Sequence, residues 1–318
     1  MPLRPVVLAV VGPTASGKSR LALEVARVVG GELISADSRQ VYRYMDIGTA
    51  KAGAAERAAV PHHLLDVVDP DQPYSIAEFR RQASAVVEDV CARGRVPIIT
   101  GGSGLYVRAL ADGLDVPAVP PDPAFRVAMF ARAELDGVDA LHQELAGIDP
   151  AAAAGIDPRN VRRTIRALEV WRHTGEPPSD TLRRKRDLPF RVVKVGIALD
   201  RQQLYAAIDQ RVDRMVEAGL VAEVASLRDR GYGWDLPSMS GIGYRQIGAV
   251  LRGESTLREA MAAVKFATHR FARQQGTWFR PDDEGIHWLE PAAIVGRMVD
   301  RVLSHYRAAI AASPVPAN

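Results

Sequence analysis

The pattern of hydrophobic positions predicts a buried strand that leads through a glycine-rich turn into a helix. Residues 6–11 form an unbroken apolar run, as expected of a strand covered on both faces of a parallel sheet. An amphipathic pattern follows over residues 18–29, and residues 32–36 have the pattern of a second short strand. The chain therefore opens with a predicted βα unit.

Strands and helices continue to alternate as far as about residue 115. Residues 75–93 have a helical pattern, with Ser75 as the N-cap and Glu78 placed to complete a capping box. Residues 95–100 form another apolar run, which ends at Gly101 and Gly102. This alternation predicts an α/β fold in which helices flank a parallel sheet.

A different pattern interrupts the α/β alternation. After several prolines between residues 117 and 123, an Ala- and Arg-rich helical stretch extends to about Gly175, and Pro177-Pro178 marks a second break. An apolar strand is predicted at residues 191–199, helices dominate from Gln202, and residues 286–289 are predicted to form the last strand. We therefore expect residues 1–120 and 189–318 to form the α/β core and residues 121–188 to form an inserted all-helical subdomain.

Composition narrows the class of protein. The chain has 318 residues, of which 47% are hydrophobic and 25% charged, as in ordinary globular proteins. Its single cysteine, Cys91, excludes a disulfide within the chain and a cysteine-based zinc site. No apolar run approaches the roughly 18–20 residues of a membrane span, and the first residues lack a signal-peptide pattern. We expect a soluble, cytoplasmic monomer without a membrane partner.

The glycine-rich turn after the first strand matches the phosphate-binding pattern G-x-x-x-x-G-K-[ST]. Its residues are Gly12, Pro13, Thr14, Ala15, Ser16, Gly17, Lys18 and Ser19. Backbone N–H groups at the start of the following helix bind phosphate oxygens, Lys18 adds positive charge, and the Ser19 hydroxyl can ligate Mg²⁺. Because most such loops, called P-loops, hold ATP or GTP, the motif alone favours a P-loop nucleotide or small-molecule kinase. Leu64-Leu65-Asp66 offers such an enzyme a further carboxylate.

A carboxylate follows the second predicted strand. Asp37 lies in Ser35-Ala-Asp-Ser-Arg-Gln40, and ligands of parallel sheets gather where the strands end. We therefore expect Asp37 on the same edge of the sheet as the phosphate loop. A carboxylate there is a magnesium ligand, a general base or a turn residue, and the spacing alone does not separate these three roles.

Positive charge is concentrated in the predicted insertion. The whole chain has a net charge of only +3, yet residues 159–191 contain ten Lys or Arg and four Asp or Glu. Arg159, Arg162, Arg163 and Arg166 fall on one helix face. Such a face predicts a surface that binds the phosphates of RNA.

Several motifs together strongly resemble the tRNA dimethylallyltransferase family. The first three are Gly12-Pro-Thr-Ala-Ser-Gly-Lys-Ser19, Ile34-Ser-Ala-Asp-Ser-Arg-Gln-Val-Tyr42 and Met45-Asp-Ile-Gly-Thr-Ala-Lys51. Further matches are Gly101-Gly-Ser-Gly-Leu-Tyr106, Arg166-Ala-Leu-Glu-Val170, Gly243-Tyr-Arg245 and Arg273-Gln-Gln-Gly-Thr-Trp-Phe-Arg280. The resemblance implies transfer of a dimethylallyl group from dimethylallyl diphosphate to N6 of the adenosine on the 3′ side of the anticodon in tRNA.

The resemblance also implies roles for individual residues. Asp37 would be the general base, Arg211 would stabilise the leaving group, and Thr14, Lys18 and Ser19 would hold the diphosphate with Mg²⁺. The tRNA anticodon stem-loop would contact Asp37, Ser38, Arg39, Gln40, Ser103, Arg162, Arg163, Arg166, Gly243, Tyr244, Arg245, Arg273 and Arg280. The family more often has threonine at the position of Ser103.

Three alternatives to this function remain open at this point. One is the P-loop kinase, which would turn over ATP. The second is a prenyltransferase acting on free AMP, although a mononucleotide needs no basic helical insertion. The third is a non-catalytic RNA-binding protein, for which a phosphate loop beside Asp37 would have no purpose.

Overall fold

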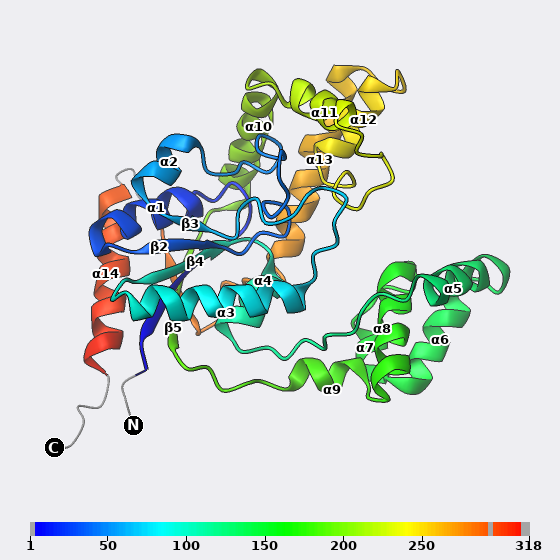
Figure 1. The fold of residues 1–318 in the computed structure, drawn as a ribbon, viewed down its shortest axis with the longest axis horizontal. Helices are drawn as coiled ribbons and strands as arrows, with labels where there is room; N and C mark the ends of the chain where they lie inside the picture. Colours follow the sequence, from blue (N-terminus) through cyan, green and yellow to red (C-terminus); the bar gives the residue numbers. More distant parts are fainter. Residues whose placement is uncertain (1–3, 292–294, 313–318) are drawn as a thin grey trace. The chain divides into compact units, whose positions relative to one another are not determined.

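The computed structural model describes residues 4–291 and 295–312. The chain divides into two compact units, one of Met1–Ala111 with Leu188–Asn318 and one of Asp112–Asp187. The second unit begins at Asp112, earlier than the expected boundary at residue 121, because the proline-rich segment belongs to it. Each unit is described below by itself (Figure 1).

The larger unit is built on a parallel six-stranded sheet with the strand order β3-β2-β4-β1-β5-β6. The strands are β1 (Val6–Val11), β2 (Glu32–Ser35), β3 (His62–His63), β4 (Pro97–Gly101), β5 (Arg191–Ile197) and β6 (Ile286–Leu289). The α/β prediction is confirmed, and five strands lie where the apolar runs predict them. β3 has only two residues, too few to produce a period in the sequence.

The unbroken apolar run of β1 is explained by helices on both faces of the sheet. Val6, Leu8 and Val10 pack with α1 (Lys18–Val29) and α14 (Val295–Ala311), which lie side by side on one face (Figure 1). Val7 and Ala9 pack on the other face with α3 (Ile76–Ala92) and α4 (Gly104–Ala111). Ser75 caps α3 as predicted, since its hydroxyl accepts from the N–H of Glu78.

A third hydrophobic cluster fixes the chain that follows β2. It joins Val41, Tyr42 and Met45 to the helices α11 (Leu220–Asp229), α12 (Tyr244–Leu251) and α13 (Leu257–Gln275). Helix α10 (Arg201–Glu217) packs against α11 and α13, while α2 (Ala54–Ala59) precedes β3. This helical group therefore lies next to the loop between β2 and α2.

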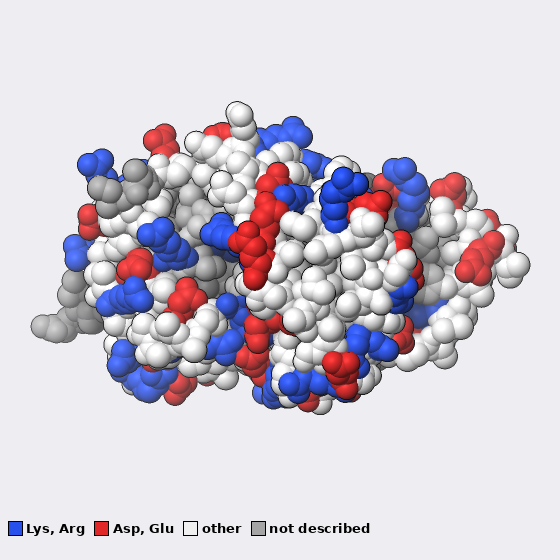
Figure 2. Space-filling view, turned by 90° about the horizontal axis from the view of Figure 1, so that it is seen from above, with Lys and Arg blue, Asp and Glu red and all other residues white. Residues whose placement is uncertain are grey.

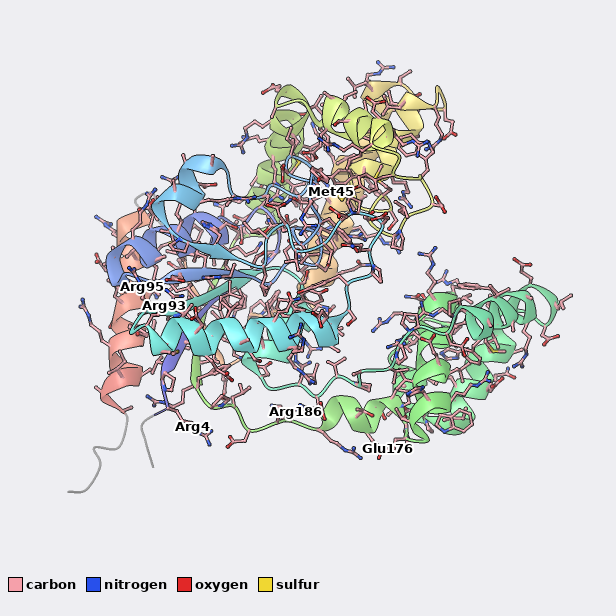
Figure 3. All side chains as sticks on the ribbon, in the orientation of Figure 1. Arg4, Met45, Arg93, Arg95, Glu176 and Arg186 are labelled. Carbon is pink, nitrogen blue, oxygen red and sulfur yellow. The ribbon has the colours of Figure 1, made fainter. Side chains whose placement is uncertain are left out.

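A cluster of ion pairs lies where β2 begins, at the opposite ends of the strands from the phosphate loop. The buried carboxylate of Glu32, the first residue of β2, accepts from Arg93 and lies 2.7 Å from Nε2 of His63. The Arg93 guanidinium lowers the pKa of Glu32 to about 2. Arg93 and Arg95 lie together at the end of α3 (Figure 3). His62 and His63 are thus held by hydrogen bonds.

The smaller unit is all-helical. Its helices are α5 (Pro123–Leu135), α6 (Val138–Ile148), α7 (Pro150–Ala154), α8 (Val161–Thr174) and α9 (Pro178–Arg183). Leu141, Leu145, Ile165 and Leu168 form its core. Its two ends run antiparallel as a neck, in which Asp115 N–H donates to Arg184 O and Arg186 N–H donates to Gly113 O. No helix in residues 4–291 and 295–312 is long and apolar enough to span a membrane.

The turn after β4 requires glycine because other groups approach it closely. A Cβ on Gly101 would lie 2.2 Å from Ala36 O, and one on Gly104 would lie 2.2 Å from the Trp278 ring. A Cβ on Gly102 would come within 2.4 Å of Gln275 Nε2. The glycines of this turn therefore serve close packing at the edge of the sheet.

Gly101→Ala is expected to lower the free energy of unfolding by about 1–3 kcal/mol, because backbone must move to admit the methyl group. Gly147→Ala is the matched control, since an added Cβ at Gly147 in α6 meets nothing within 4 Å. The control should leave stability equal or raise it by about 0.5–1 kcal/mol. Denaturant unfolding of the two variants measures both effects, and equal stability would contradict the packing argument.

Candidate active site

The phosphate loop has the geometry of an anion-binding nest. Gly12, Ala15 and Gly17 have positive φ angles of 140°, 62° and 86°, which turn the loop around the start of α1. Lys18 is buried and its Nζ donates to Pro13 O at 3.0 Å. Burial lowers the pKa of Lys18 to about 8, with a further lowering by Arg211 and an opposing rise from Asp37. A bound anion would therefore stabilise the protonated form of Lys18.

Three cavities lie at the edge of the sheet where the strands end. Their volumes are about 850, 300 and 50 Å³. Arg211 lines all three, and Asp37 lines the two smaller ones. The smallest brings together the residues predicted to act on the diphosphate: Thr14, Lys18, Ser19, Asp37 and Arg211. Asp37 is thus on the same edge of the sheet as the phosphate loop, where the strand order places it.

The segment that carries Asp37 is fixed by its neighbours. Asp37 Oδ1 accepts from Arg39 N–H at 2.8 Å, so the carboxylate forms a turn as well as lining the cavities. Ser38 N–H donates to Ser103 Oγ at 3.0 Å, and the Arg39 guanidinium donates to Pro237 O at 2.8 Å. The Gln40 amide donates to Thr49 O at 3.1 Å. Residues predicted to contact tRNA therefore also hold Asp37 in place.

Arg211 projects from α10 into the cavities without a carboxylate partner. Within residues 4–291 and 295–312, no Asp or Glu oxygen lies within ion-pair distance of it. Burial lowers its pKa, and the more distant charge of Asp37 raises it. A half-buried guanidinium without a counter-ion favours an anionic ligand.

Gln275 is a site residue that the sequence analysis missed. Its Oε1 accepts from Thr14 N–H and its Nε2 donates to Gly102 O, both at 2.8 Å. The buried amide thereby joins the phosphate loop to the turn after β4. A lone glutamine at the end of a helix carries no pattern by which the sequence could reveal this role.

The residues present fit a magnesium–diphosphate ligand. The described residues contain no group of three or more His, Cys, Asp or Glu that could hold a metal alone, so Mg²⁺ would share Ser19 with phosphate oxygens and water. The buried Ser16 Oγ and Thr100 Oγ1 have no hydrogen-bond partner among the described residues, and Thr100 lines the smallest cavity. Buried polar atoms without partners are expected where a polar ligand binds.

A P-loop kinase would need, besides Asp37, an aspartate at the end of a strand next to β1, and the described residues offer none there. P-loop NTPases hold Mg²⁺ with an aspartate in addition to the loop hydroxyl. The strands beside β1 are β4 and β5, which end in Thr100-Gly101 and Gly196-Ile197 without an acidic residue. Asp66, which the sequence analysis considered for this role, is occupied by Lys51 at 2.7 Å and Arg57 at 2.6 Å.

Two of the four arginines predicted to bind RNA, Arg159 and Arg166, form ion pairs, and Arg159 lies before the start of α8. Arg166 pairs with Glu169 and donates to Val119 O, and Arg159 pairs with Asp157 at 3.0 Å. Arg162 and Arg163 are exposed and have no ion-pair partner among the described residues. Acidic and basic side chains are interspersed on the face that Figure 2 shows. Both carboxylates are close in the sequence, since Glu169 lies one turn further along α8 and Asp157 lies two residues before Arg159.

The remaining predicted tRNA-binding residues differ in exposure. Tyr244 is only 1% exposed and its hydroxyl donates to Glu223 Oε1 at 2.7 Å, so its ring offers no free stacking surface. Arg245 and Arg280 are exposed, and Gly243 precedes α12 with a φ of 95°. Arg273 is exposed and donates to Tyr205 Oη at 2.7 Å. Trp278 packs against Gly104.

Known proteins match nearly the whole chain. The model of a family described as IPP transferase matches residues 40–282. The tRNA dimethylallyltransferase of Roseiflexus sp. strain RS-1 is 48% identical over 302 residues, covering 92% of this chain and 99% of the relative. That of Roseiflexus castenholzii is 51% identical over 274 residues, covering 86% and 89%.

Solved structures agree with these matches. The full-length tRNA isopentenylpyrophosphate transferase of Bacillus halodurans superimposes with a TM-score of 0.69 at 38% identity, covering 96% of this chain and 97% of that one. A eukaryotic dimethylallyltransferase acting on tRNA gives a TM-score of 0.78 at 26% identity, covering 99% and 81%. The resemblance seen in the motifs is confirmed: the chain belongs to the IPP transferase family.

Proposed function

We propose that this protein transfers a dimethylallyl group from dimethylallyl diphosphate to N6 of the adenosine on the 3′ side of the anticodon in tRNA, releasing diphosphate. The observation that carries the proposal is one cavity in which Asp37 faces the phosphate loop and Arg211. The names of the matched relatives, tRNA dimethylallyltransferases, support the same activity. In this cavity the positive charges of Lys18 and Arg211 suit a reactant that leaves with negative charge. The carboxylate of Asp37 suits a reactant that loses a proton.

The phosphate loop binds the donor. Its backbone amides, Lys18 and Arg211 surround the diphosphate, whose negative charge grows as the allylic C–O bond breaks and the diphosphate takes the electron pair. Groups fixed in advance stabilise this charge without reorganising. Ser19 would help to hold Mg²⁺, which would supply further positive charge. ATP hydrolysis has no part in this step.

Asp37 serves the acceptor. The adenosine N6 lone pair forms the new N–C bond, and the proton that N6 loses passes to Asp37 and then to solvent. The bond from Arg39 N–H keeps one oxygen of the carboxylate in the turn and so orients the other. Thr14 lines both smaller cavities and positions the two reactants.

The two larger cavities provide one site for each substrate. The cavity of about 850 Å³ is lined by Lys18, Ser19 and Arg211, and we assign it to the donor. The cavity of about 300 Å³ extends from Asp37 to Tyr244, and we assign it to the adenine, which an enzyme acting on a base takes out of the stack. Since Arg211 lines both, the substrates meet beside it.

The helical unit supplies charge for the RNA backbone. Arg162 and Arg163 are exposed arginines of α8 without ion-pair partners among the described residues, and we propose that they contact phosphates of the anticodon stem-loop. Arg166 instead stabilises the unit through Glu169, which also accepts from Arg126 at 2.7 Å.

Asp37→Asn is expected to reduce prenyl transfer about 10²–10⁴-fold, because the amide cannot take the N6 proton. The Asn side-chain oxygen can still accept from Arg39 N–H, so the turn and the binding of tRNA and donor should persist. Incorporation of labelled dimethylallyl diphosphate into unmodified tRNA measures transfer, and filter binding measures tRNA affinity. Retained transfer in the variant would rule out Asp37 as the base.

The kcat/KM for the donor is expected to decline as pH rises through about 8, where Lys18 in the free enzyme loses its proton and its positive charge. Bound diphosphate raises the pKa of Lys18, so kcat should hold to higher pH. Lys18→Arg keeps its charge and should lack this decline, whatever its absolute rate. A decline shared by both proteins would assign the pH dependence to another group.

The double variant Arg162→Ala/Arg163→Ala is expected to weaken tRNA binding at low salt and to reduce the slope of log K against log salt by roughly 0.7–0.9 per lost phosphate contact. Its melting temperature should not change, because both side chains are exposed. Arg166→Ala should instead lower the melting temperature, since it leaves Glu169 short of a partner. Unaltered affinity of the double variant would exclude this face from the interface.

A further inference from the structure

The loop after β2 divides the two larger cavities. Ile47 and Ala50 line the cavity assigned to the donor, whereas Gly48 and Thr49 line the cavity assigned to the adenine. Thr49 and Ala50 also line the small cavity between them. We call residues 46–51 the partition loop. Its position decides where the two substrate sites meet.

Glu223 of α11 holds the partition loop from one side. Its Oε2 accepts from the N–H groups of Asp46 at 2.9 Å and Ile47 at 2.7 Å, and its Oε1 accepts from Gly48 N–H at 3.1 Å. Tyr244 Oη donates to Oε1 at 2.7 Å. Three successive amides and one phenol thus converge on a single carboxylate, as amides converge on an anion in a nest.

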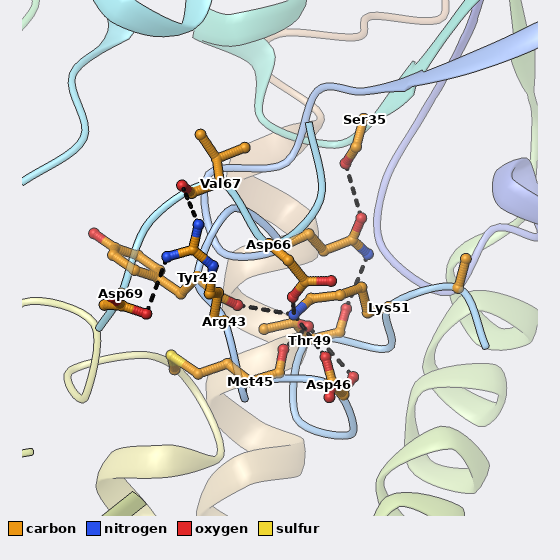
Figure 4. A network of polar contacts seen from close by, with 12 residues as sticks. Ser35, Tyr42, Arg43, Met45, Asp46, Thr49, Lys51, Asp66, Val67 and Asp69 are labelled. Atoms are coloured by element: carbon orange, nitrogen blue, oxygen red, sulfur yellow. Dashed lines mark hydrogen bonds and ion pairs between the residues drawn. The ribbon is translucent and has the colours of Figure 1, made fainter. Parts of the chain in front are cut away.

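Lys51, the last residue of the partition loop, fixes the other end of the loop. Its buried Nζ donates to Tyr42 O at 2.8 Å, Asp46 Oδ1 at 2.6 Å and Asp66 Oδ1 at 2.7 Å (Figure 4). Ala50 has a φ of 47°, the left-handed conformation that costs a non-glycine residue energy. Strained conformations persist where the surrounding contacts determine them, and they often occur at functional sites.

The fit between the loop and α12 leaves no space for adjustment. A Cβ on Gly48 would lie 2.6 Å from the ring of Tyr244. Burial and the neighbouring Glu223 raise the pKa of Tyr244, so its hydroxyl remains a donor at all ordinary pH values. The carboxylate of Glu223 therefore fixes the distance between α11 and the loop, and Tyr244 fixes the distance from α12.

We propose that Glu223 is a positioning residue for prenyl transfer, which places the partition loop so that the two substrate cavities meet at Asp37. It acts through backbone amides and Tyr244, and it lines none of the three cavities. The inference rests on the proposed function, since it concerns how donor and acceptor are aligned. The rate of transfer is sensitive to this alignment, because a shift of about 1 Å in a reactant can change a rate roughly 10²-fold.

Glu223→Gln tests this inference at nearly constant shape. The glutamine amide retains one acceptor oxygen and turns an N–H donor toward amide donors, so the loop should shift. We expect kcat to fall about ten- to a hundred-fold and KM for dimethylallyl diphosphate to rise. The Kd for tRNA, measured without donor, should stay the same. Glu217→Gln on α10 is the matched control. It removes an exposed carboxylate, and kcat and KM should both keep their wild-type values.

Tyr244→Phe is the second variant, and it decides the question if Glu223→Gln does not fold. It removes one of the four bonds to Glu223 and should give a kcat between those of the wild type and Glu223→Gln. All rates are measured per folded molecule, well below each melting temperature. A lower melting temperature with the wild-type kcat would show that Glu223 is only structural and would overturn the inference. If the wild type itself transfers no label, the proposed function fails first.

Discussion

Parallel strand direction is the constraint on which the rest of this structure depends. Because all the strands of the sheet run the same way, the ends of β1, β2 and β4 meet at one edge. The phosphate loop follows β1, Asp37 follows β2, and the glycine turn follows β4. Three segments far apart in the sequence are thereby brought to one place before any side chain is considered.

Electrostatics then gives that edge its chemical character. Lys18 is buried and Arg211 is half-buried, and loss of solvent is the main cause that lowers the pKa of each. Asp37 partly balances the two cations, but it forms an ion pair with neither among the described residues. Such an arrangement disfavours an empty site and favours a ligand that brings negative charge. A diphosphate that gains charge as it departs is better matched to it than a neutral substrate.

Periodicity and motif spacing predicted most of the scaffold, because each βα unit repeats a strong local pattern. The strand at Val6–Val11, the helix at Lys18–Val29 and the edge location of Asp37 follow from that pattern. The contacts of Gln275 and Glu223 do not, since each depends on a helix meeting a loop far away in the sequence. The ion pairs of Arg166 and Arg159 are different, because Glu169 and Asp157 lie within three residues of them, at spacings that the sequence alone displays.

The antiparallel neck of the helical unit has a consequence for how such a protein can vary. Gly113 and Arg186 are hydrogen-bonded to each other, so the chain leaves and re-enters the smaller unit at a single point. Lengthening, shortening or exchanging everything beyond that point would leave the register of the sheet intact. Recombination of gene segments can therefore exchange the helical unit without changing the unit that contains the sheet.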